Sequence, residues 1–249
     1  MAYRHLNVVA EGSVGAMTLN RPDKLNALSV DLMHEIVAAS AELSVSPVRT
    51  VVVSGTGRAF STGFDLTSLA TLETSGSGVE AARLGQAMGD AVADMRPVTV
   101  AALHGHVVGG GVVLAAACDL RLAAADTVFS IPEVDLGIPL AWGGIPRLVR
   151  EFGPALTREL VMTCRPFSAE EAASRGFLNG VVPTGEHLAA AAALAEAVAA
   201  RPALPVATTK QHVAEVMRGD FGRDDAAGLI AALADPESMA ARTAYLERR

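Results

Sequence analysis

The stretch GHVVGGGVVLAAACDL, residues 105–120, decides how the rest of the chain folds. It places three consecutive glycines, Gly109 to Gly111, inside an apolar run, although glycine weakens both helices and strands. The β-branched run RPVTVAALHG, residues 96–105, precedes the glycines and is typical of a strand buried on both faces of a sheet. We therefore expect a helix to begin at the glycines, with free backbone N–H groups at the positive end of its dipole.

The segment GRAFSTGFDL, residues 57–66, has the same arrangement earlier in the chain. It follows the buried-strand pattern RTVVVSGTG, residues 49–57, turns at Gly63, and reaches Asp65, which can cap the helical turn that follows. If the two glycine segments converge, their backbone N–H groups can hold an oxyanion together. The alternative is that the glycines only let a helix pack closely on a strand, and the residues alone leave both interpretations open.

Composition limits the kinds of protein that this chain can be. Its 249 residues, 51% of them apolar, can bury one large core near the upper size of a single domain. A net charge of −7 argues against a nucleic-acid surface and favours a small-molecule partner. Cys118 and Cys164 lack the spacing of a metal site, and we expect both to be reduced, buried thiols. No targeting or membrane-spanning pattern stands out, so we expect a cytoplasmic protein.

Hydrophobic periodicity predicts alternating strands and helices in the first half of the chain. Residues 6–20 predict two short strands that turn at Gly12, and residues 29–43 predict a helix. The polar segment 71–85 predicts a loop that leads into a helix starting near Val79.

The chain from Ser168 onward has an almost wholly helical pattern. Ser168 and Glu171 have the spacing of a capping box, which marks one helix start. The pair Asp235-Pro236 marks another, because aspartate caps a helix well and proline suits its first turn.

Four motifs together resemble one known family. They are NRPDKLNAL (20–28), GRAFSTGFDL (57–66), HGHVVGGGVVLAAACDLRLAA (104–124) and FSIPEVDLGI (129–138). In this order and spacing they resemble the enoyl-CoA hydratase/isomerase (crotonase) superfamily over essentially the whole chain. The resemblance implies an α/β fold, a ClpP/crotonase-like spiral of short ββα units that forms two nearly perpendicular sheets. It further implies a core over residues 1–190 with an acyl-CoA site, and a C-terminal helical region over 191–249 that completes the site and a homo-oligomer, a trimer or a dimer of trimers.

The resemblance also assigns catalytic roles. The backbone N–H groups of Phe64 and Gly110 correspond to the family's oxyanion hole for the thioester carbonyl, and Glu133 corresponds to one of two glutamates in family hydratases. The other glutamate position is Val113 here, and Ala141 stands where some relatives carry an acid. Holding the carbonyl as an enolate acidifies the neighbouring carbon, so a nearby base of matched pKa is needed. Apolar surroundings are expected to raise the pKa of Glu133.

One carboxylate that faces an apolar wall favours isomerisation over hydration. Moving a double bond from the 3 to the 2 position of an enoyl-CoA takes one proton from carbon 2 and returns one at carbon 4, which a single base can do. Family members that resemble 3,2-enoyl-CoA isomerases keep only the counterpart of Glu133. Two alternatives stay open: a hydratase that works with one glutamate, assisted by Asp135, which points the same way in an extended segment, and an acyl-CoA binding protein without turnover.

The remaining expectations concern the substrate. The resemblance implies an acyl-CoA thioester as substrate, with coenzyme A entering as part of it, and neither a further cofactor nor a metal. Phe129, Leu140 and Trp142 are expected to line the acyl pocket, whose other wall is expected from residues 67–80. Structural roles are expected for three polar residues: His104, His106 and Asp119. The candidate substrate-binding residues are Lys24, Leu25, Ala59, Ser61, Thr62, Gly63, Asp65, Gly109, Trp142 and Lys210, the last reaching a phosphate from a neighbouring subunit.

Overall fold

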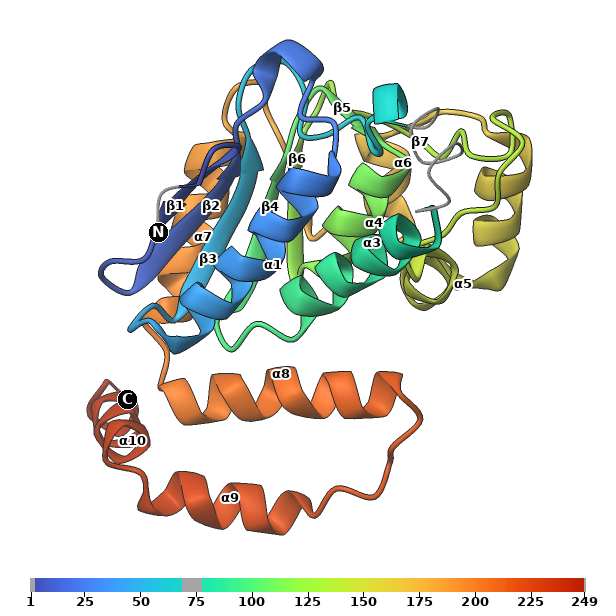
Figure 1. Cartoon of the computed structure of the whole chain (residues 1–249). Helices are drawn as coiled ribbons and strands as arrows, with labels where there is room; N and C mark the ends of the chain where they lie inside the picture. Colours follow the sequence, from blue (N-terminus) through green and yellow to red (C-terminus); the bar gives the residue numbers. More distant parts are fainter. Residues whose placement is uncertain (1–2, 69–77, 249) are drawn as a thin grey trace.

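The computed structural model describes residues 3–68 and 78–248, and its strands form two sheets (Figure 1). The larger sheet has the strand order β1-β2-β3-β4-β6-β9, with β1 and β2 antiparallel and all other neighbours parallel. The smaller sheet has the order β5-β7-β8. The strands are β1 (Leu6–Val9), β2 (Val14–Leu19), β3 (Thr50–Gly55), β4 (Val98–Leu103), β5 (His106–Val108), β6 (Leu120–Ala124), β7 (Val128–Ser130), β8 (Phe167–Ser168) and β9 (Gly180–Val182).

Helices cover both faces of the larger sheet. Figure 1 shows α1 and α3 in front of the sheet and α7 behind it. The alternation along β3 explains this arrangement, because successive side chains of a strand point to opposite faces. Val51 and Val53 pack in the main core with Ile36 of α1, whereas Val52 packs with Ala195 of α7. The helices are α1 (Val30–Val45), α3 (Gly78–Ala93), α4 (Gly110–Ala117), α5 (Gly144–Thr163), α6 (Ala169–Ser174), α7 (His187–Ala199), α8 (Ala203–Met217), α9 (Asp225–Ala234) and α10 (Pro236–Glu247).

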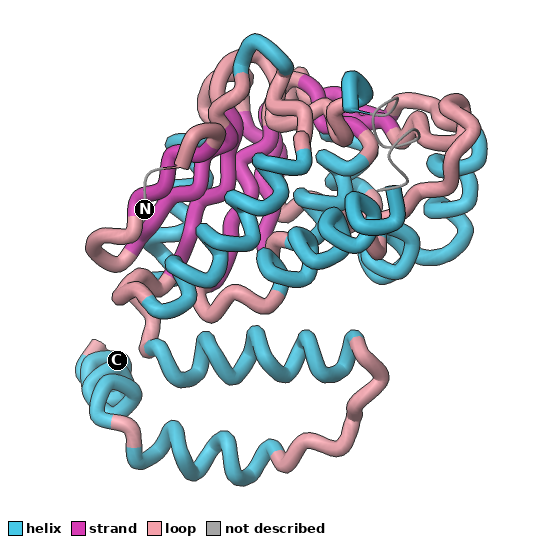
Figure 2. Tube along the Cα trace, in the orientation of Figure 1, coloured by secondary structure: helices cyan, strands magenta, loops and turns pink. Residues whose placement is uncertain are grey.

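The last three helices lie apart from the sheets. Figures 1 and 2 show α8, α9 and α10 below the core, with α8 nearest to it. The expected boundary at residue 190 falls inside α7, which packs on the larger sheet, so the core extends to Ala199. No single helix of the described residues is long and apolar enough to cross a membrane, and α7 and α8 pass that test only as a pair bent by 110°.

Most of the expected elements are confirmed at their expected positions. The hairpin β1–β2 turns at Gly12, which has φ +71°, and α1 and α3 begin at residues 30 and 78. The loop expected before α3 lies mostly outside the described residues. The Ser168 hydroxyl accepts a hydrogen bond from the Glu171 amide at the start of α6, and the Asp235 carboxylate caps α10. The short strand β9 is an exception, because it lies in a region where only helices were expected.

The predicted transition at the glycine triplet is also confirmed. The short strand β5 ends at Val108, and α4 begins at Gly110 with its first residues fully buried. Gly109 has φ +50° and ψ −116°, a backbone conformation that side chains other than hydrogen rarely allow. The glycine is therefore required where the chain turns from the strand into the helix.

Hydrogen bonds of Asn26 hold the loop that follows β3 in place. Its amide donates to the carbonyls of Thr56 and Ala59, each at 2.8 Å, and its Oδ1 accepts from the Arg21 amide at 2.9 Å. Its own carbonyl accepts from the Ser61 hydroxyl at 2.9 Å. Because Asn26 is fully buried, water competes little with its bonds to Ala59 and Ser61, which are buried at both ends.

Substitution of Asn26 by alanine should destabilise the protein and lower its activity. The buried Ala59 carbonyl loses its hydrogen bond from Asn26, which lowers the free energy of unfolding by about 1–3 kcal/mol, and the loop that carries Phe64 loses contacts that hold it in place. Urea unfolding measures the free energy, with the exposed β1 residue changed in Asn7→Ala as the control, for which a change within about 0.5 kcal/mol is expected. Equal losses in the two variants would contradict the role given to Asn26.

Candidate active site

The segments that follow β3 and β4 are joined by hydrogen bonds between their backbones. The amides of Phe60 and Ser61 donate to the carbonyls of His104 and His106 at 3.0 and 3.3 Å. The Val108 amide returns a bond to the Ser61 carbonyl at 2.9 Å. These bonds bring the two glycine segments together at the carboxyl ends of parallel strands, where α/β proteins place ligands.

Two backbone N–H groups are available at this meeting point. Among the described residues, the amides of Phe64 and Gly110 donate to no other group. A Cβ on Gly63 would lie 3.0 Å from the Gly110 nitrogen and 2.7 Å from the Val108 carbonyl oxygen, so the two segments touch closely here. Gly110 is the first residue of α4, and the helix dipole therefore favours negative charge beside its amide. The arrangement is suited to hold a carbonyl oxygen that gains negative charge.

The carboxylate of Glu133 lies beside these amides. A Cβ built on Gly109 would overlap its Oε1, and its Oε2 is buried without a hydrogen-bond partner among the described residues. Desolvation by burial raises the pKa of Glu133, and one backbone hydrogen bond offsets part of that effect. This direction confirms the expected shift. A carboxyl with a raised pKa can both accept and return a proton near neutral pH.

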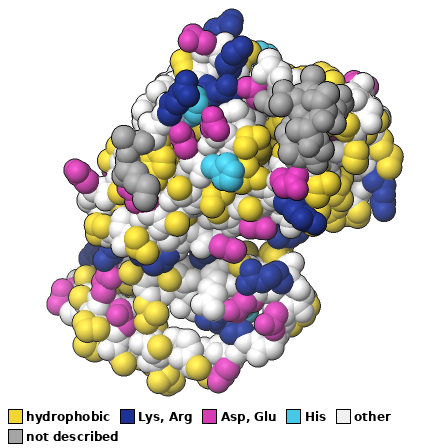
Figure 3. Space-filling model, in the orientation of Figure 1, with side chains coloured by type: hydrophobic (Ala, Val, Ile, Leu, Met, Phe, Trp, Pro, Cys, Tyr) yellow, Lys and Arg dark blue, Asp and Glu magenta, His cyan; other side chains and the backbone are white. Residues whose placement is uncertain are grey.

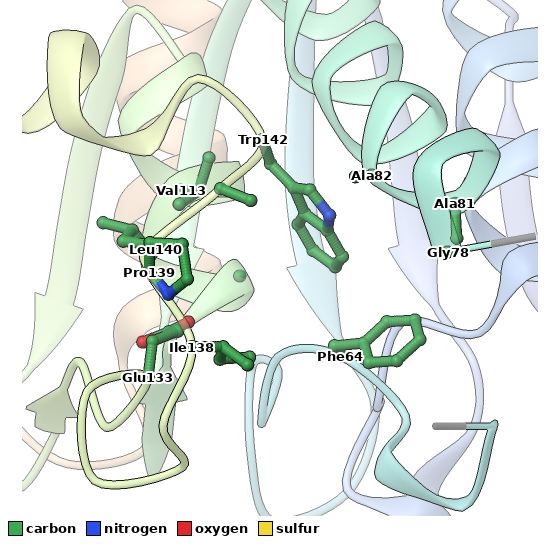
Figure 4. A pocket seen from close by; sticks show the side chains of 12 residues that line it. Phe64, Gly78, Ala81, Ala82, Val113, Glu133, Ile138, Pro139, Leu140 and Trp142 are labelled. Atoms are coloured by element: carbon green, nitrogen blue, oxygen red, sulfur yellow. The ribbon is translucent and has the colours of Figure 1, made fainter. Parts of the chain in front are cut away.

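An apolar pocket of about 320 Å³ opens in front of Glu133. Figure 4 shows Glu133, Ile138, Pro139, Leu140 and Val113 on one side, Ala81, Ala82 and Gly78 on the other, and Trp142 and Phe64 between them. Among the described residues that line the pocket, Glu133 is the one with an ionisable side chain. Val113 and Ala141, at the two positions where family acids were expected, also line it.

Helix α3 contributes more to this pocket than the sequence predicted: Gly78 lies within the wall expected over 67–80, whereas Ala81 and Ala82 were not expected there. Gly78, Ala81 and Ala82 line it, and Gly85 lies one turn further along the helix. Small residues at spacings of three and four share one face of a helix, which is a signal that the sequence did contain.

Two expectations about the pocket are wrong. The segment after Glu133 is not extended: the amide of Ile138 donates back to the Glu133 carbonyl at 3.0 Å and the chain turns. Asp135 is therefore exposed and does not line the pocket. Phe129 also lies elsewhere, fully buried in the core with its ring stacked on Phe167 at 5.2 Å.

The segments 24–25 and 59–62, predicted to bind the CoA portion, are brought together. The Leu25 carbonyl accepts from the Thr62 amide at 3.1 Å and from its hydroxyl at 3.3 Å. Ser61 is fully buried and bonded to the neighbouring Asn26 carbonyl, so its side chain supports the loop. Binding of CoA by these segments stays a prediction.

The two candidate lysines lie in different places. Lys24 is exposed at the end of the 3₁₀ helix η1 (Pro22–Lys24), next to the loops just described. Lys210 of α8 donates to the Asp119 carboxylate at 2.7 Å and to the Pro97 carbonyl at 2.8 Å, ahead of strands β6 and β4. The pocket lies at the other ends of these strands, so Lys210 does not reach it within one chain. Its contact with a neighbouring subunit's substrate stays a prediction.

Asp65 holds the end of the loop that carries Phe64. Its Oδ2 pairs with Arg21 at 2.9 Å, and its Oδ1 accepts from the Thr67 hydroxyl at 2.6 Å and amide at 3.2 Å, as a cap of the 3₁₀ helix η2 (Leu66–Ser68). Burial alone would raise the pKa of Asp65, but the hydrogen bonds from Thr67 and Arg21 outweigh it, and the net pKa is lowered. Asp65 is therefore a positioning group.

Of the three polar residues given structural roles, Asp119 and His104 have structural side-chain contacts, whereas the role expected for His106 stays a prediction. The Asp119 carboxylate accepts from the Thr99 amide at 2.7 Å and hydroxyl at 2.9 Å, which links β4 to the start of β6. His104 stacks on His187 with ring centroids 4.5 Å apart, and His106 is exposed in β5. Cys118 and Cys164 are free, buried thiols. No three metal-ligating side chains cluster within residues 3–68 and 78–248.

Comparison with known proteins shows which family this chain is related to. The sequence profile described as enoyl-CoA hydratase/isomerase matches residues 9–249. The chain belongs to this family. The enoyl-CoA hydratase/isomerase fold expected from the motifs is thereby confirmed, and the protein is an acyl-CoA enzyme.

Individual relatives match over nearly the whole chain. The crotonyl-CoA hydratase of Syntrophomonas wolfei is 33% identical over 256 residues, which cover 100% of this chain and 97% of the relative. The peroxisomal Δ(3,5)-Δ(2,4)-dienoyl-CoA isomerase of Arabidopsis thaliana is 36% identical over 225 residues, 84% of this chain and 81% of the relative. The crystal structure of an enoyl-CoA hydratase from Bacillus anthracis superimposes with a TM-score of 0.89 at 26% identity, covering 99% of this chain and 97% of that one.

Substitution of Gly109 by alanine should displace the Glu133 carboxylate and lower kcat by roughly a hundredfold or more, the range of a lost general base. The matched control is Gly185→Ala, which has φ +88° and open space where its Cβ would lie. Both variants place a Cβ on a backbone of positive φ, at a cost of roughly 1–3 kcal/mol in stability. Steady-state kinetics should separate them, and similar kcat values in both would refute the contact between Gly109 and Glu133.

Glu133→Gln should make the protein more stable at neutral pH. Burial raises the pKa of Glu133 in the folded state above its unfolded value. The contribution of protonated Glu133 to the free energy of unfolding is therefore complete below the unfolded pKa, and it is lost as the pH rises through the folded pKa. Glutamine carries no charge at any pH. The gain in free energy of unfolding should therefore shrink as the pH falls towards about 4.3, the ordinary pKa of a glutamate side chain. Urea unfolding at several pH values measures the difference, with the exposed Glu170→Gln as control. A gain that does not depend on pH would count against a raised pKa.

Proposed function

We propose that the protein is a 3,2-enoyl-CoA isomerase. The observation that carries this proposal is that Glu133 is the one carboxylate among the described lining residues, while Val113 and Ala141 occupy the other family acid positions. The thioester carbonyl lies between the N–H groups of Phe64 and Gly110. Glu133 takes a proton from carbon 2, and the electron pair moves onto the carbonyl oxygen to give an enolate. The protonated Glu133 then returns a proton to carbon 4, which is bonded by the electron pair of the 3,4 double bond. The enolate oxygen re-forms the carbonyl, and the double bond now lies between carbons 2 and 3.

The arrangement lowers the barrier through electrostatics. Each donor of this kind typically contributes roughly 3–4 kcal/mol to stabilising the oxyanion, and the dipole of α4 adds to it. The apolar lining keeps water away from the enolate, which would otherwise compete for protonation. The raised pKa of Glu133 matches its two tasks as base and acid.

Hydration is the second candidate because relatives such as the Syntrophomonas wolfei protein are named hydratases. Hydration adds a water molecule across the double bond, and family hydratases position that water with two glutamates. Here Val113 is fully buried and apolar at one of those positions, and Asp135 is exposed outside the pocket. Both facts favour isomerisation. The dienoyl-CoA isomerase of Arabidopsis thaliana supports the same reaction type with a different substrate.

We further propose that α8, α9 and α10 form contacts between copies of the chain, in a trimer or a dimer of trimers. Leu229, Ile230 and Leu233 of α9 are 61%, 64% and 45% exposed, which is unusual for a free helix surface. Figure 3 shows hydrophobic side chains beside charged ones over this helical region. An interface between copies would bury them.

The purified protein should convert a 3-enoyl-CoA into the 2-enoyl-CoA, and Glu133→Gln should slow that conversion by about 10²–10⁴-fold. Absorbance of the conjugated thioester measures the product. The protein should be offered 3-enoyl-CoA, 2-enoyl-CoA and 3,5-dienoyl-CoA in separate assays. Asp135→Asn is the control, and it should retain full activity because Asp135 lies outside the pocket.

The other outcomes identify the alternatives. Loss of the conjugated chromophore from 2-enoyl-CoA, without isomerisation of 3-enoyl-CoA, would establish a hydratase. Conversion of the dienoyl substrate alone would establish a dienoyl-CoA isomerase. Binding of all three without turnover would establish a non-catalytic protein, and full activity of Glu133→Gln would show that another group is the base.

A further inference from the structure

The Trp142 side chain fills a slot between two helices. A Cβ built on Gly85 of α3 would overlap its five-membered ring, and a Cβ built on Gly110 of α4 would overlap its six-membered ring. The ring also meets Phe64 edge to face, with centroids 5.9 Å apart and an interplanar angle of 84°. Figure 4 shows the indole projecting into the pocket between Val113 and Ala82. The two glycines therefore leave a space that the indole occupies, directly beside the oxyanion amide of Gly110.

The backbone at Trp142 needs support to hold this position. Trp142 has φ +58° and Gly143 has φ +66°, and the left-handed conformation is unfavourable for a large side chain such as tryptophan. Arg147 supplies the support, because its Nη1 donates to the carbonyls of Trp142 and Gly143, each at 3.2 Å. A rigid planar guanidinium can serve two carbonyls and a carboxylate at once.

The second terminal nitrogen of the Arg147 guanidinium binds to α3, the helix that lines the pocket. Its Nη2 donates to Asp90 of α3 at 2.6 Å, and its side chain is 7% exposed. A Cβ on Gly89 would come within 3.2 Å of the guanidinium, so this helix leaves room for Arg147 as it does for the indole one turn earlier. Gly85 and Gly89 thus place both groups along one face of α3.

We propose that Arg147 and Asp90 are positioning residues that hold the Trp142 indole between α3 and α4, where it ends the acyl pocket and limits the length of the acyl chain. The accepted substrates are enoyl-CoA thioesters whose chain stops at the indole, since a longer chain would have to pass between Gly85 and Gly110. The part of this proposal that names the substrates rests on the proposed function. The part that says the indole is held in place does not depend on it. A purely structural ion pair would affect stability and leave both the mobility of the indole and the chain-length preference unchanged.

The chain has a single tryptophan, so its fluorescence reports on Trp142 alone. Time-resolved anisotropy and acrylamide quenching of the unliganded protein measure how firmly the indole is held. Asp90→Asn should increase both the fast anisotropy decay and the quenching, and Asp90→Glu should restore the wild-type values because it keeps the carboxylate. The control Glu159→Gln removes an ion pair with Arg165 near the far end of α5 and should change neither quantity.

Gly85→Ala tests the slot without removing a charge. Alanine favours a helix interior over glycine, so α3 itself should not suffer, yet its Cβ would displace the indole. The matched control is Gly228→Ala in α9, whose Cβ would make an ordinary contact at 3.7 Å with Thr208. Gly85→Ala should shift the tryptophan emission and raise quenching, while Gly228→Ala should match the wild type.

The kinetic test uses straight-chain thioesters of increasing length. In Asp90→Asn, kcat/KM for the longest chain relative to the shortest should rise roughly tenfold, about the effect of one methylene on kcat/KM in an apolar pocket. Gly85→Ala serves only the fluorescence test, because its Cβ narrows the passage between Gly85 and Gly110. Unchanged anisotropy and quenching in both variants would overturn the proposal. A loosened indole with an unchanged chain-length preference would overturn the limit on the acyl chain. Failure of the proposed isomerisation would show as inactivity of the wild type, while the fluorescence differences would remain.

Discussion

The main-chain pairing of the loops after β3 and β4 is the constraint on which the rest of the site depends. Each loop leaves a buried parallel strand, and hydrogen bonds between residues 60–61 and 104–108 lock the two together. This pairing uses the loops' own donors but leaves the amides of Phe64 and Gly110 free among the described residues. Because buried amides without partners are costly, a ligand oxygen is the natural group to satisfy them.

The same pairing decides where the acid lies. Gly109 donates its amide to the Ser130 carbonyl at 2.9 Å, which brings the end of β7 and the following Glu133 against the glycine triplet. The absence of a side chain on Gly109 is what lets the carboxylate lie against the glycine triplet. Its burial among apolar residues disfavours the charged form and raises its pKa, which under the proposed function suits a group that carries a proton between two carbons.

The pocket also depends on how α3 and α5 are held relative to each other. The ion pair between Asp90 and Arg147 links them, and the left-handed turn at Trp142 and Gly143 is stabilised by the same guanidinium. The lining of the pocket and the support of its aromatic wall therefore share one connection. Small residues along α3 make this close approach possible.

Strands β1 to β4, several helix starts, the glycine turn and the candidates Phe64, Gly110 and Glu133 could be predicted from the sequence, because they depend on local backbone requirements and recognisable motifs. The short strand β9 was missed. Only the tertiary structure decided that the segment after Glu133 turns and leaves Asp135 in solvent. It also decided that Lys210 pairs with Asp119, and that α3 supplies a slot for the Trp142 indole. Such contacts join residues far apart in the chain, and hydrophobic periodicity carries no information about which faces will meet.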